Sequence, residues 1–437
     1  MGVFKEITKK GGVKMEKTVY WIWLSLACTP GSSTFSSLLE RFSDAEEIYR
    51  ADEQELHRAI GRRATDRHAL LDKGLDRAKE ILEFCRSKRV GIVTYADPTY
   101  PESLREISSP PVLLYYRGVW PDFNSGDFFA AIVGTRSVSD YGRKNTFTIA
   151  HDLARAGAII VSGMAIGIDG VALAGALSAG GVTVAVIGSG IDVCYPSQHV
   201  SLAREIVKRG CVITEFAPGT PPNKFNFPKR NRIISGLSAA TLVMEGREKS
   251  GALITARCAK EQGRAVYALP GNVGSPNSEV TNLLLKNGAR ALVSADDVVR
   301  DYEHQYHGRL NPFKLAEKSE FDIGLTLSSL KVAATAPSDN IFFGGGAREC
   351  VKEAPREMAQ EKPARPPAME EPKKEAPLPN FDKQTLALYK KIPTDGEVQI
   401  ESLVDEDNDL RAVMKKLLKL EMGHFIVMLP GERVKRK

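Results

Sequence analysis

AAIVGTRSVSDYG (residues 130–142), AIIVSGMAIGIDG (158–170) and TVAVIGSG (183–190) are the three stretches that decide the fold. Each begins with a short apolar run rich in β-branched residues and then turns at a glycine. Runs of this kind are typical of strands that are buried on both faces of a sheet. The segments between them are each about long enough for one helix, so the sequence predicts consecutive βαβ units and a parallel sheet.

The turns that follow these strands are expected to carry the binding site. Crossovers between parallel strands are almost always right-handed, so the turns at residues 134–139, 162–169 and 188–192 should open along one edge of the sheet. Each turn supplies backbone N–H groups beside a helix N-terminus, an arrangement that attracts phosphate. We therefore expect the ligand to lie along that edge.

The composition bounds the class of protein. A chain of 437 residues is expected to form two to four domains, and 43% hydrophobic with 26% charged residues is typical of a soluble globular protein. The net charge of +6 permits a nucleic-acid partner without requiring one. The six cysteines are scattered, without a CxxC pair or a histidine at ligand spacing. This pattern favours inert thiols, a reduced cytoplasmic location and no metal site.

The N-terminal residues raise one alternative. Five lysines precede the apolar run VYWIWLSLAC (residues 19–28), which resembles the core of a signal peptide. The run is short, no small-residue cleavage site follows it, and the next residues continue as a helical domain. We therefore expect a cytoplasmic chain, with Met15 as a candidate initiator, and no membrane-spanning segment.

Composition along the chain predicts four regions. Residues 15–95 carry apolar residues at helical spacing and should form a small helical domain, and residues 96–305 hold the α/β sheet. Residues 306–379 are expected to be a disordered linker, because seven prolines fall between positions 355 and 379 among interleaved charges. Residues 380–437 should form three short helices and a β-wing, the pattern of a winged-helix module.

Within the α/β region the same patterns predict the remaining elements. Glycines follow the expected helices as stop signals. Further strands are expected at residues 112–116, 212–216, 241–245, 265–269 and 291–293. Helices are expected at residues 142–156, 169–179, 197–209, 252–262 and 278–287.

Familiar nucleotide-binding and catalytic motifs are missing from the sequence. There is no GxxxxGK[ST] loop and no GxSxG elbow, and neither Gly134 nor Gly188 opens a GxGxxG. A P-loop ATPase and a dinucleotide enzyme are therefore disfavoured, and no cofactor is predicted. The pair His304 and His307 lacks further ligands and is expected to be solvated rather than metal-binding.

The richest candidate for ligand contact is NKFNFPKRNRIIS (residues 223–235). Cations for phosphates and aromatic rings for bases are how proteins hold single-stranded nucleic acid without strict sequence reading. Alternatively, the phenylalanines are core residues and the cations a solvated surface, and composition alone leaves the two interpretations balanced. The segment follows the strand ending at residue 216, so we expect a basic loop over the same edge. Its members are Lys224, Phe225, Phe227, Lys229, Arg230, Asn231 and Arg232.

Three acidic residues close strands or turns on this edge. Glu215 and Glu245 end two strands and are candidates for an acid/base pair, although we prefer that they bind neighbouring arginines or cap loops. Asp169 is expected to be the N-cap of the helix that follows the second turn. SGALITA (residues 250–256) and PGNVGS (270–275) should add hydroxyl and N–H groups at further strand ends.

These motifs closely resemble those of the DNA-processing protein A (DprA/Smf) family. The resemblance covers about residues 132–293, and the helical and C-terminal regions look like that family's sterile-alpha-motif-like and winged-helix domains. It implies an extended Rossmann-like, mostly parallel sheet flanked by these two domains. The matching motifs, in order, are VGTRSVSDYG, SGMAIGID, GALSAGGVTVAVIGSGIDVCYP, ITEFAPG, FPKRNRIISGLS, VMEG, SGALITA and LPGNVGSPNS.

The resemblance also implies a function. It implies a non-catalytic protein that binds single-stranded DNA, usually as a homodimer. It implies that the protein displaces single-strand-binding protein and loads the RecA recombinase in natural transformation or recombination. By motif, DNA contact carries over to Arg136, Ser139, Ser162, Gly163, Gly167, Lys229, Arg230, Asn231 and Arg232, and Gly134 and Lys224 complete the predicted DNA-binding set.

Two positions depart from the family pattern, and two other functions stay open. The family's second turn reads SGxARGID followed by a histidine, whereas this chain has Ile166 and Leu173, so one cation is missing.

One alternative function is a nucleotide or ribosyl-phosphate hydrolase that uses Glu245 or Glu215 as acid/base. The other is a regulator that binds duplex DNA through the winged helix. Its helix at residues 410–420 carries Arg411, Lys415, Lys416 and Lys419.

Overall fold

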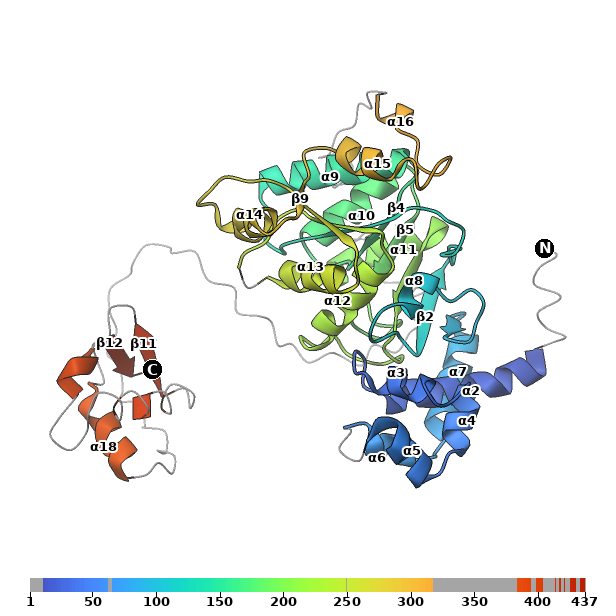
Figure 1. Ribbon diagram of the computed structural model, residues 1–437, viewed down its shortest axis with the longest axis horizontal. Helices are drawn as coiled ribbons and strands as arrows, with labels where there is room; N and C mark the ends of the chain where they lie inside the picture. The colour runs from blue at the N-terminus through green and yellow to red at the C-terminus, as the bar shows by residue number, and fades with distance from the viewer. Residues whose placement is uncertain are drawn as a thin grey trace, which may run out of the picture. The chain divides into compact units, whose positions relative to one another are not determined.

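The structure is a computed structural model that forms two units, divided between residues 350 and 351, and each unit is described by itself (Figure 1). Among the described residues, no helix combines the length and the hydropathy that a membrane span requires. The described residues are 11–61, 65–248, 250–316, 383–393, 398–403, 413, 416, 417, 420, 425–429 and 433–436.

The first unit begins with helices that pack against the sheet. Aspartates start two of them: the Asp44 carboxylate accepts from the backbone N–H of Glu47, and Asp52 forms a capping box with Glu55. The helices are α2 (Gly11–Ala27), α3 (Thr34–Leu39), α4 (Ala45–Arg50), α5 (Glu53–Ile60), α6 (Arg67–Leu71) and α7 (Asp76–Ser87).

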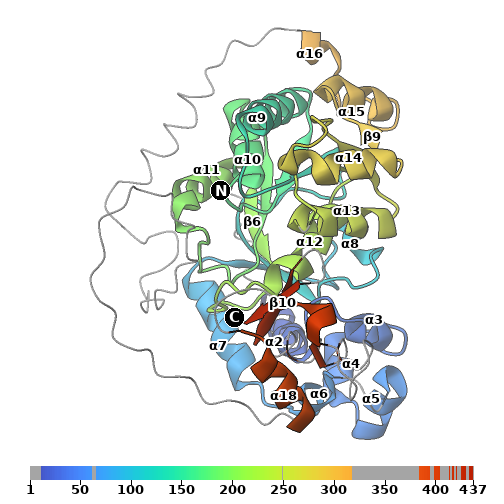
Figure 2. The same ribbon diagram turned by 90° about the vertical axis from the view of Figure 1, so that its left-hand side faces the viewer.

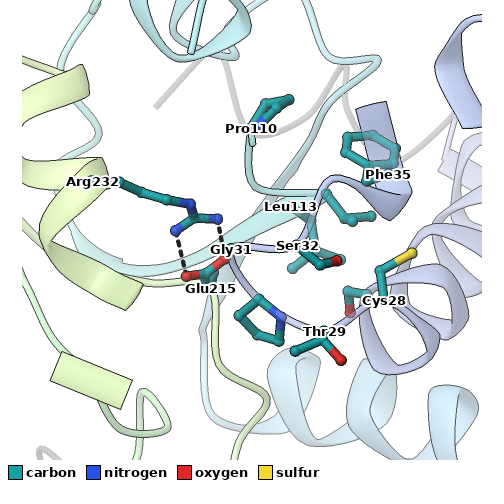
Figure 3. A pocket seen from close by; sticks show the side chains of 12 residues that line it. Cys28, Thr29, Gly31, Ser32, Phe35, Pro110, Leu113, Glu215 and Arg232 are labelled. Carbon is teal, nitrogen blue, oxygen red and sulfur yellow. Dashed lines mark hydrogen bonds and ion pairs between the residues drawn. The ribbon is translucent and has the colours of Figure 1, made fainter. Parts of the chain in front are cut away.

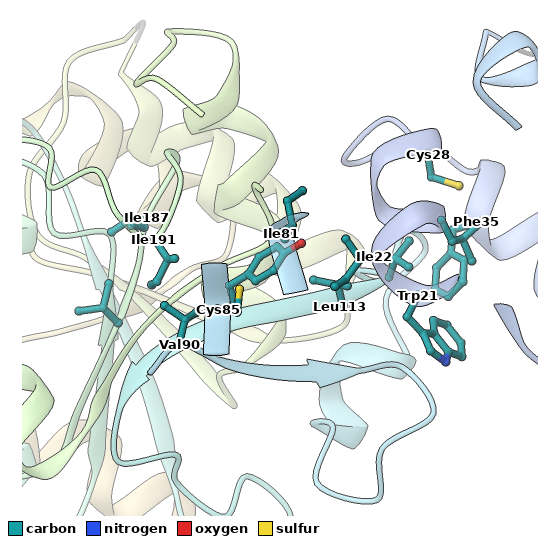
Figure 4. Packing of buried hydrophobic residues seen from close by; sticks show 14 of the residues in the cluster. Trp21, Ile22, Cys28, Phe35, Ile81, Cys85, Val90, Leu113, Ile187 and Ile191 are labelled. Carbon is teal, nitrogen blue, oxygen red and sulfur yellow. The ribbon is translucent and has the colours of Figure 1, made fainter. Parts of the chain in front are cut away.

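The apolar run at residues 19–28 packs in a core rather than standing alone. Trp21 and Ile22 of α2 are buried in the same cluster as Cys85 of α7 and residues of the sheet such as Leu113 and Ile187 (Figure 4). One hydrophobic core therefore joins the helical region to one face of the sheet.

The sheet has nine strands in the order β1-β2-β6-β5-β4-β3-β7-β8-β9. The strands β3 to β9 run parallel, while β1 and β2 are antiparallel additions at one side. Every residue of β3 to β7 is buried, which confirms the expectation of strands covered on both faces. The strands are β1 (Gly91–Thr94), β2 (Leu113–Gly118), β3 (Phe129–Val133), β4 (Ile159–Ser162), β5 (Thr183–Val186), β6 (Cys211–Thr214), β7 (Ala240–Val243), β8 (Ala265–Ala268) and β9 (Arg290–Ala291).

Helices cover both faces of the sheet (Figure 2). Along β3, Ala130 and Ile132 face the α9, α10 and α15 side, while Ala131 and Val133 face the α12, α13 and α14 side, as the two-residue period of a strand requires. Helices α12, α15 and the short α8 and α16 were not predicted. The helices are α8 (Glu102–Arg105), α9 (Asp140–Arg155), α10 (Ile168–Ser178), α11 (Val200–Arg209) after the 3-10 turn η1 (Ser197–His199), α12 (Asn226–Gly236), α13 (Gly251–Glu261), α14 (Glu279–Lys286), α15 (Ala295–Tyr302) and α16 (Phe313–Ala316).

Two of the expected domain boundaries differ from the structure. Strand β1 pairs with β2 in the large sheet, although residues 91–94 fall inside the expected helical domain. Leu310 is buried in the core under α9, and the Asn311 N–H donates to the Ala156 carbonyl at 2.8 Å. Residues 306–316 therefore belong to the α/β unit rather than to the expected linker, and the rest of that linker lies outside the described residues.

The second unit contains α18 (Lys383–Lys391), η3 (Ile400–Leu403) and the antiparallel sheet β10-β12-β11. The strands are β10 (Val398–Gln399), β11 (Ile426–Leu429) and β12 (Arg433–Arg436). Most of the expected helix at residues 410–420, including Arg411, Lys415 and Lys419, lies outside the described residues, so the winged helix stays a prediction. The buried apolar residues are Leu388, Ile392, Ile400, Leu403, Val413, Leu417, Leu420, Ile426 and Val434.

Candidate nucleic-acid interface

The carboxyl ends of the central strands bring the predicted turns together. From β3 the chain proceeds to β4, β5 and β6 on one side, and it then continues as β7 on the other side of β3. The topological switch point therefore lies between β3 and β7. The Thr135 N–H donates to the Glu245 carbonyl at 2.8 Å, and the Ile168 N–H donates to the Thr135 carbonyl at 3.1 Å. Arg136 and Arg230 line one cavity of about 240 Å³ at this point. The first and second turns and the basic segment therefore share one edge.

The basic segment is a helix rather than the expected loop. Helix α12 begins at Asn226, and Pro228 lies in its first turn, where a missing N–H group is tolerated. Ile233 and Ile234 pack against the sheet, and this face draws Arg230, Asn231 and Arg232 into the interior at 4%, 8% and 8% exposure. Helix α12 therefore buries Arg230, Asn231 and Arg232, which the sequence predicted to lie on a loop over the edge of the sheet.

Arg230 ties α12 to the ends of two strands. Its guanidinium Nη1 donates to the carbonyl of Gly163 at 2.7 Å and to that of Val186. Burial lowers the pKa of Arg230 to about 10, an effect that nearby Asp169 opposes, so the side chain stays charged at neutral pH. The Nη1 atom is committed to the protein's own backbone, which makes Arg230 a fixed part of the cavity wall.

Arg232 forms a buried ion pair with Glu215 (Figure 3). Its two terminal nitrogens donate to the two carboxylate oxygens at 2.6 and 2.7 Å, and its Nε donates to the Ser109 carbonyl at 2.9 Å. A two-point pair of this kind fixes both side chains in geometry. The interpretation that Glu215 binds a neighbouring arginine is confirmed. Arg232, which is predicted to contact DNA, is buried in this ion pair.

Glu245 caps the first turn. Its carboxylate accepts from the backbone N–H of Ser139 at 3.0 Å, from the Ser139 hydroxyl, and from the Asn277 amide at 3.4 Å. Ser139 is also the N-cap of α9 and accepts from the Gly142 N–H at 3.0 Å. A carboxylate of the chain itself therefore occupies the N-terminus of α9. The loop-capping interpretation of Glu245 is confirmed, and both the N–H and the hydroxyl of Ser139 are engaged within the protein.

Asp169 is not the N-cap that the sequence suggested. Helix α10 begins at Ile168, and its N-cap is Gly167 with φ +90°, a conformation that favours glycine. A Cβ on Gly167 would collide with the Thr135 carbonyl. Asp169 lies in the first turn, buried beside Arg230, and accepts a weak hydrogen bond from the Ala165 N–H at 3.4 Å. Burial raises the pKa of Asp169, and the Arg230 charge opposes the rise.

A group of rings and cations, exposed except for the half-buried Phe227, lies at the same edge. The Arg136 guanidinium lies 5.2 Å from the centre of the Phe227 ring, and the Tyr195 ring lies 5.7 Å from that centre at an angle of 35°. The Lys224 ammonium lies 5.2 Å from the Phe225 ring, which is 65% exposed, so the core interpretation is wrong for Phe225. We call these five residues the aromatic–cation surface. Tyr195 was missed, although its place just after the third turn, at residues 188–192, could have indicated it.

The remaining predicted residues divide between surface and interior. The Ser162 hydroxyl is fully buried and donates to the Ile132 carbonyl at 2.6 Å. Gly163 is buried, Gly134 and Gly167 are partly buried within the turns, and Lys229 is partly buried on α12. The Asn231 amide donates to the Gly251 carbonyl at 3.3 Å. Of the predicted DNA-binding set, Arg136 and Lys224 stay exposed.

The two departures from the family pattern have different surroundings. Ile166 is 47% exposed and lines a small pocket with Arg136, Tyr195 and Phe227, so the missing cation would lie on the aromatic–cation surface. Leu173 is fully buried in the α10 core. The first departure thus leaves an apolar side chain on this surface, and the second lies in the core.

Comparison with known proteins identifies the family. Residues 91–303 match the family described as DNA recombination-mediator protein A. DNA processing protein DprA of Bacillus subtilis is 37% identical over 233 residues, which cover 53% of this chain and 78% of that protein. Protein Smf of Escherichia coli is 41% identical over 209 residues, which cover 48% of this chain and 55% of that protein. The match thus spans about half of the length of the E. coli protein.

A solved structure agrees with the sequence comparisons. The X-ray structure of DNA processing protein A (DprA) from Streptococcus pneumoniae superposes with a TM-score of 0.56 at 32% identity. The superposition covers 65% of this chain and 98% of that chain. The family match at residues 91–303 includes every strand of the sheet whose carboxyl edge carries the turns and the aromatic–cation surface. The chain therefore belongs to the DNA recombination-mediator protein A family, the DprA/Smf family.

Proposed function

We propose that this protein binds single-stranded DNA along the carboxyl edge of its sheet. The aromatic–cation surface is the observation that carries this proposal. It combines exposed rings, on which unpaired bases stack, with cations that neutralise phosphates. It lies at the topological switch point, where open α/β sheets bind their ligands.

The structure changes which residues we expect to contact the strand. Arg136 and Lys224 are exposed and meet the phosphates, whereas Arg230 and Arg232 shape the interface from below. Phe227 and Tyr195 offer ring faces to bases, and stacking tolerates every base because each has a π-face. Binding should therefore depend little on sequence and strongly on salt.

The same proposal extends to the protein's role. The family is described as a recombination mediator, and relatives are named DNA processing proteins. These descriptions support a role in which the protein binds incoming DNA during transformation or recombination and loads RecA onto it. We further propose a homodimer in the cytoplasm that has no catalytic activity of its own.

The hydrolase alternative loses its candidate acid/base groups. Glu215 is held by two charge-assisted hydrogen bonds from Arg232, and Glu245 is held by Ser139 and Asn277. A general base needs a carboxylate that can reach the proton of a substrate. Both carboxylates serve the fold in this structure, which favours the binding function over hydrolysis.

Anisotropy of a labelled oligo-dT strand tests the proposal with the full chain. Replacing Arg136 or Phe227 with alanine should each weaken binding by about tenfold, because each removes one phosphate or one stacking contact. Arg300→Ala is the control, since that side chain is 74% exposed on α15, and it should bind as the parent does. Parent-like affinity in both site variants would refute the assigned surface.

A further inference from the structure

A cavity of about 440 Å³ lies between the start of α9, the α10 helix and the start of α11. Figure 2 shows these three helices on one side of the sheet and α12 and α13 on the other. Among its described lining residues, Arg136 is the one that also lines the 240 Å³ cavity at the switch point. The larger cavity is therefore a second hollow, next to the aromatic–cation surface but built from different helices.

The cavity exists because α10 carries small residues where it faces its neighbours. A Cβ on Gly170 would lie 2.5 Å from the ring of His199 in η1, so the two segments approach closely there. Ala174 follows one turn later on the same face of the helix. Val171 and Leu202 complete the floor, and both are only 5% exposed. The bottom of the cavity is thus apolar.

Cations and an amide surround the apolar floor. Arg136 and Gln198 are exposed, Arg143 is half-buried, and all three line the cavity beside the exposed Ile166. The Arg143 guanidinium forms no ion pair or hydrogen bond with any described residue. No aspartate or glutamate is among the described residues that line the cavity. Two positive charges therefore stand beside an apolar floor without a carboxylate to neutralise them.

This combination favours a peptide over a nucleic-acid strand. Unpaired bases stack on aromatic rings, and no phenylalanine, tyrosine or tryptophan is among the described lining residues. The floor is stabilised by contact with an apolar group, whereas guanidinium groups pair with carboxylates in a two-point geometry. The Gln198 amide offers both a donor and an acceptor, as a peptide group requires. An apolar side chain flanked by carboxylates on a peptide backbone satisfies all of these groups.

We propose that this cavity, here named the α10 pocket, binds an acidic segment of a partner protein that places one large apolar side chain on the floor. Carboxylates of the segment pair with Arg136 and Arg143, and its backbone pairs with Gln198. Because Arg136 also belongs to the aromatic–cation surface, a bound segment and a bound strand use the same cation. The segment should therefore weaken strand binding, a consequence that rests on the proposed function.

Three matched peptides test the α10 pocket on the full chain by fluorescence anisotropy. The first is a short, labelled acidic peptide with a central phenylalanine. The second has serine in place of the phenylalanine, and the third has asparagine and glutamine in place of the acids. The second and third should each bind about tenfold more weakly than the first, because one loses the buried ring and the other loses the charge-assisted hydrogen bonds. Excess oligo-dT should displace the first peptide.

Two variants place the peptide in the α10 pocket. Arg143→Gln should weaken binding of the first peptide by about fivefold or more. Lys144→Gln is the matched control, because Lys144 is the next residue of α9, carries the same charge and is exposed outside the pocket. Ala174→Leu fills the floor and should abolish peptide binding while oligo-dT affinity stays within about twofold of the parent. Urea unfolding verifies that this variant is folded.

The outcomes separate this inference from the proposed function. Equal binding of the three peptides, or equal binding of the first peptide to the parent and to Arg143→Gln, overturns the α10 pocket. A dimer of the parent that Ala174→Leu converts to a monomer in sedimentation also overturns it, because a second copy then covers the pocket. Strand binding without peptide binding overturns this inference alone. Peptide binding without strand binding supports the pocket and overturns the single-stranded DNA function.

Discussion

Replacing Arg232 with alanine removes the guanidinium that pairs with Glu215 at 2.6 and 2.7 Å and leaves that carboxylate in the interior. The two side chains are only 10% and 5% exposed, so water cannot replace the lost partner without a change in packing. Breaking a buried pair on one side typically costs about 3–5 kcal/mol. Because domains of this kind are stable by about 5–15 kcal/mol, the variant should lose a large share of its stability.

Urea unfolding followed by tryptophan fluorescence measures this loss, because Trp21 and Trp23 are buried in the core shared with the sheet. The Arg232→Ala variant should unfold at a clearly lower urea concentration. Arg136→Ala is the control, since the side chain is exposed, and should stay within about 0.5 kcal/mol of the parent. Replacing both members of the pair, Arg232→Met with Glu215→Leu, should recover most of the stability.

The DNA affinity of the same variants completes the test. Under conditions where each variant is folded, Arg136→Ala should lose affinity for oligo-dT, and Arg232→Ala should lose far less. An Arg232→Ala variant that is as stable as the parent but binds no DNA would refute the reasoning, because Arg232 would then be a contact residue.

Three further predictions follow from single positions. Gly167→Ala should destabilise the protein by more than Gly219→Ala in urea unfolding: both glycines have positive φ, but only at Gly167 would the added Cβ meet a carbonyl. Burial lowers the pKa of His199, so below about pH 6.5 the unfolded chain binds the proton more readily than the folded chain, and stability falls on acidification. His199→Gln should therefore reduce the loss of stability measured between about pH 7.5 and about pH 5.5. Tyr195→Ala should weaken oligo-dT binding by about fivefold or more without changing the free energy of unfolding by more than about 0.5 kcal/mol, because the ring is 40% exposed.

The sheet could be predicted because burial on both faces leaves a direct trace in the sequence. The β-branched runs at residues 130–133 and 183–187 have no polar alternation, and each ends at a glycine. A pattern of this kind can be recognised without knowing which distant residues pack against the strand. It also located the turns at the carboxyl edge, which depend on the handedness of the crossovers.

The site was harder to predict because its geometry depends on contacts far apart in sequence. Arg232 is drawn inside by a carboxylate 17 residues earlier, and Ser139 is engaged by Glu245, which lies 106 residues later. Sequence composition treats Arg230 and Arg232 as surface cations, because guanidinium groups are usually exposed unless they are paired. Nothing local to residues 223–235 indicates which of its cations find such partners.

Photocrosslinking tests the central claim most directly. An oligo-dT strand that carries 5-iododeoxyuridine is irradiated on the full chain, and the crosslinked peptides are identified by mass spectrometry. We predict crosslinks to the peptides that contain Tyr195 and Phe227, and their loss in the Arg136→Ala variant. Crosslinks confined to residues 383–436, with none on the carboxyl edge of the sheet, would contradict the account.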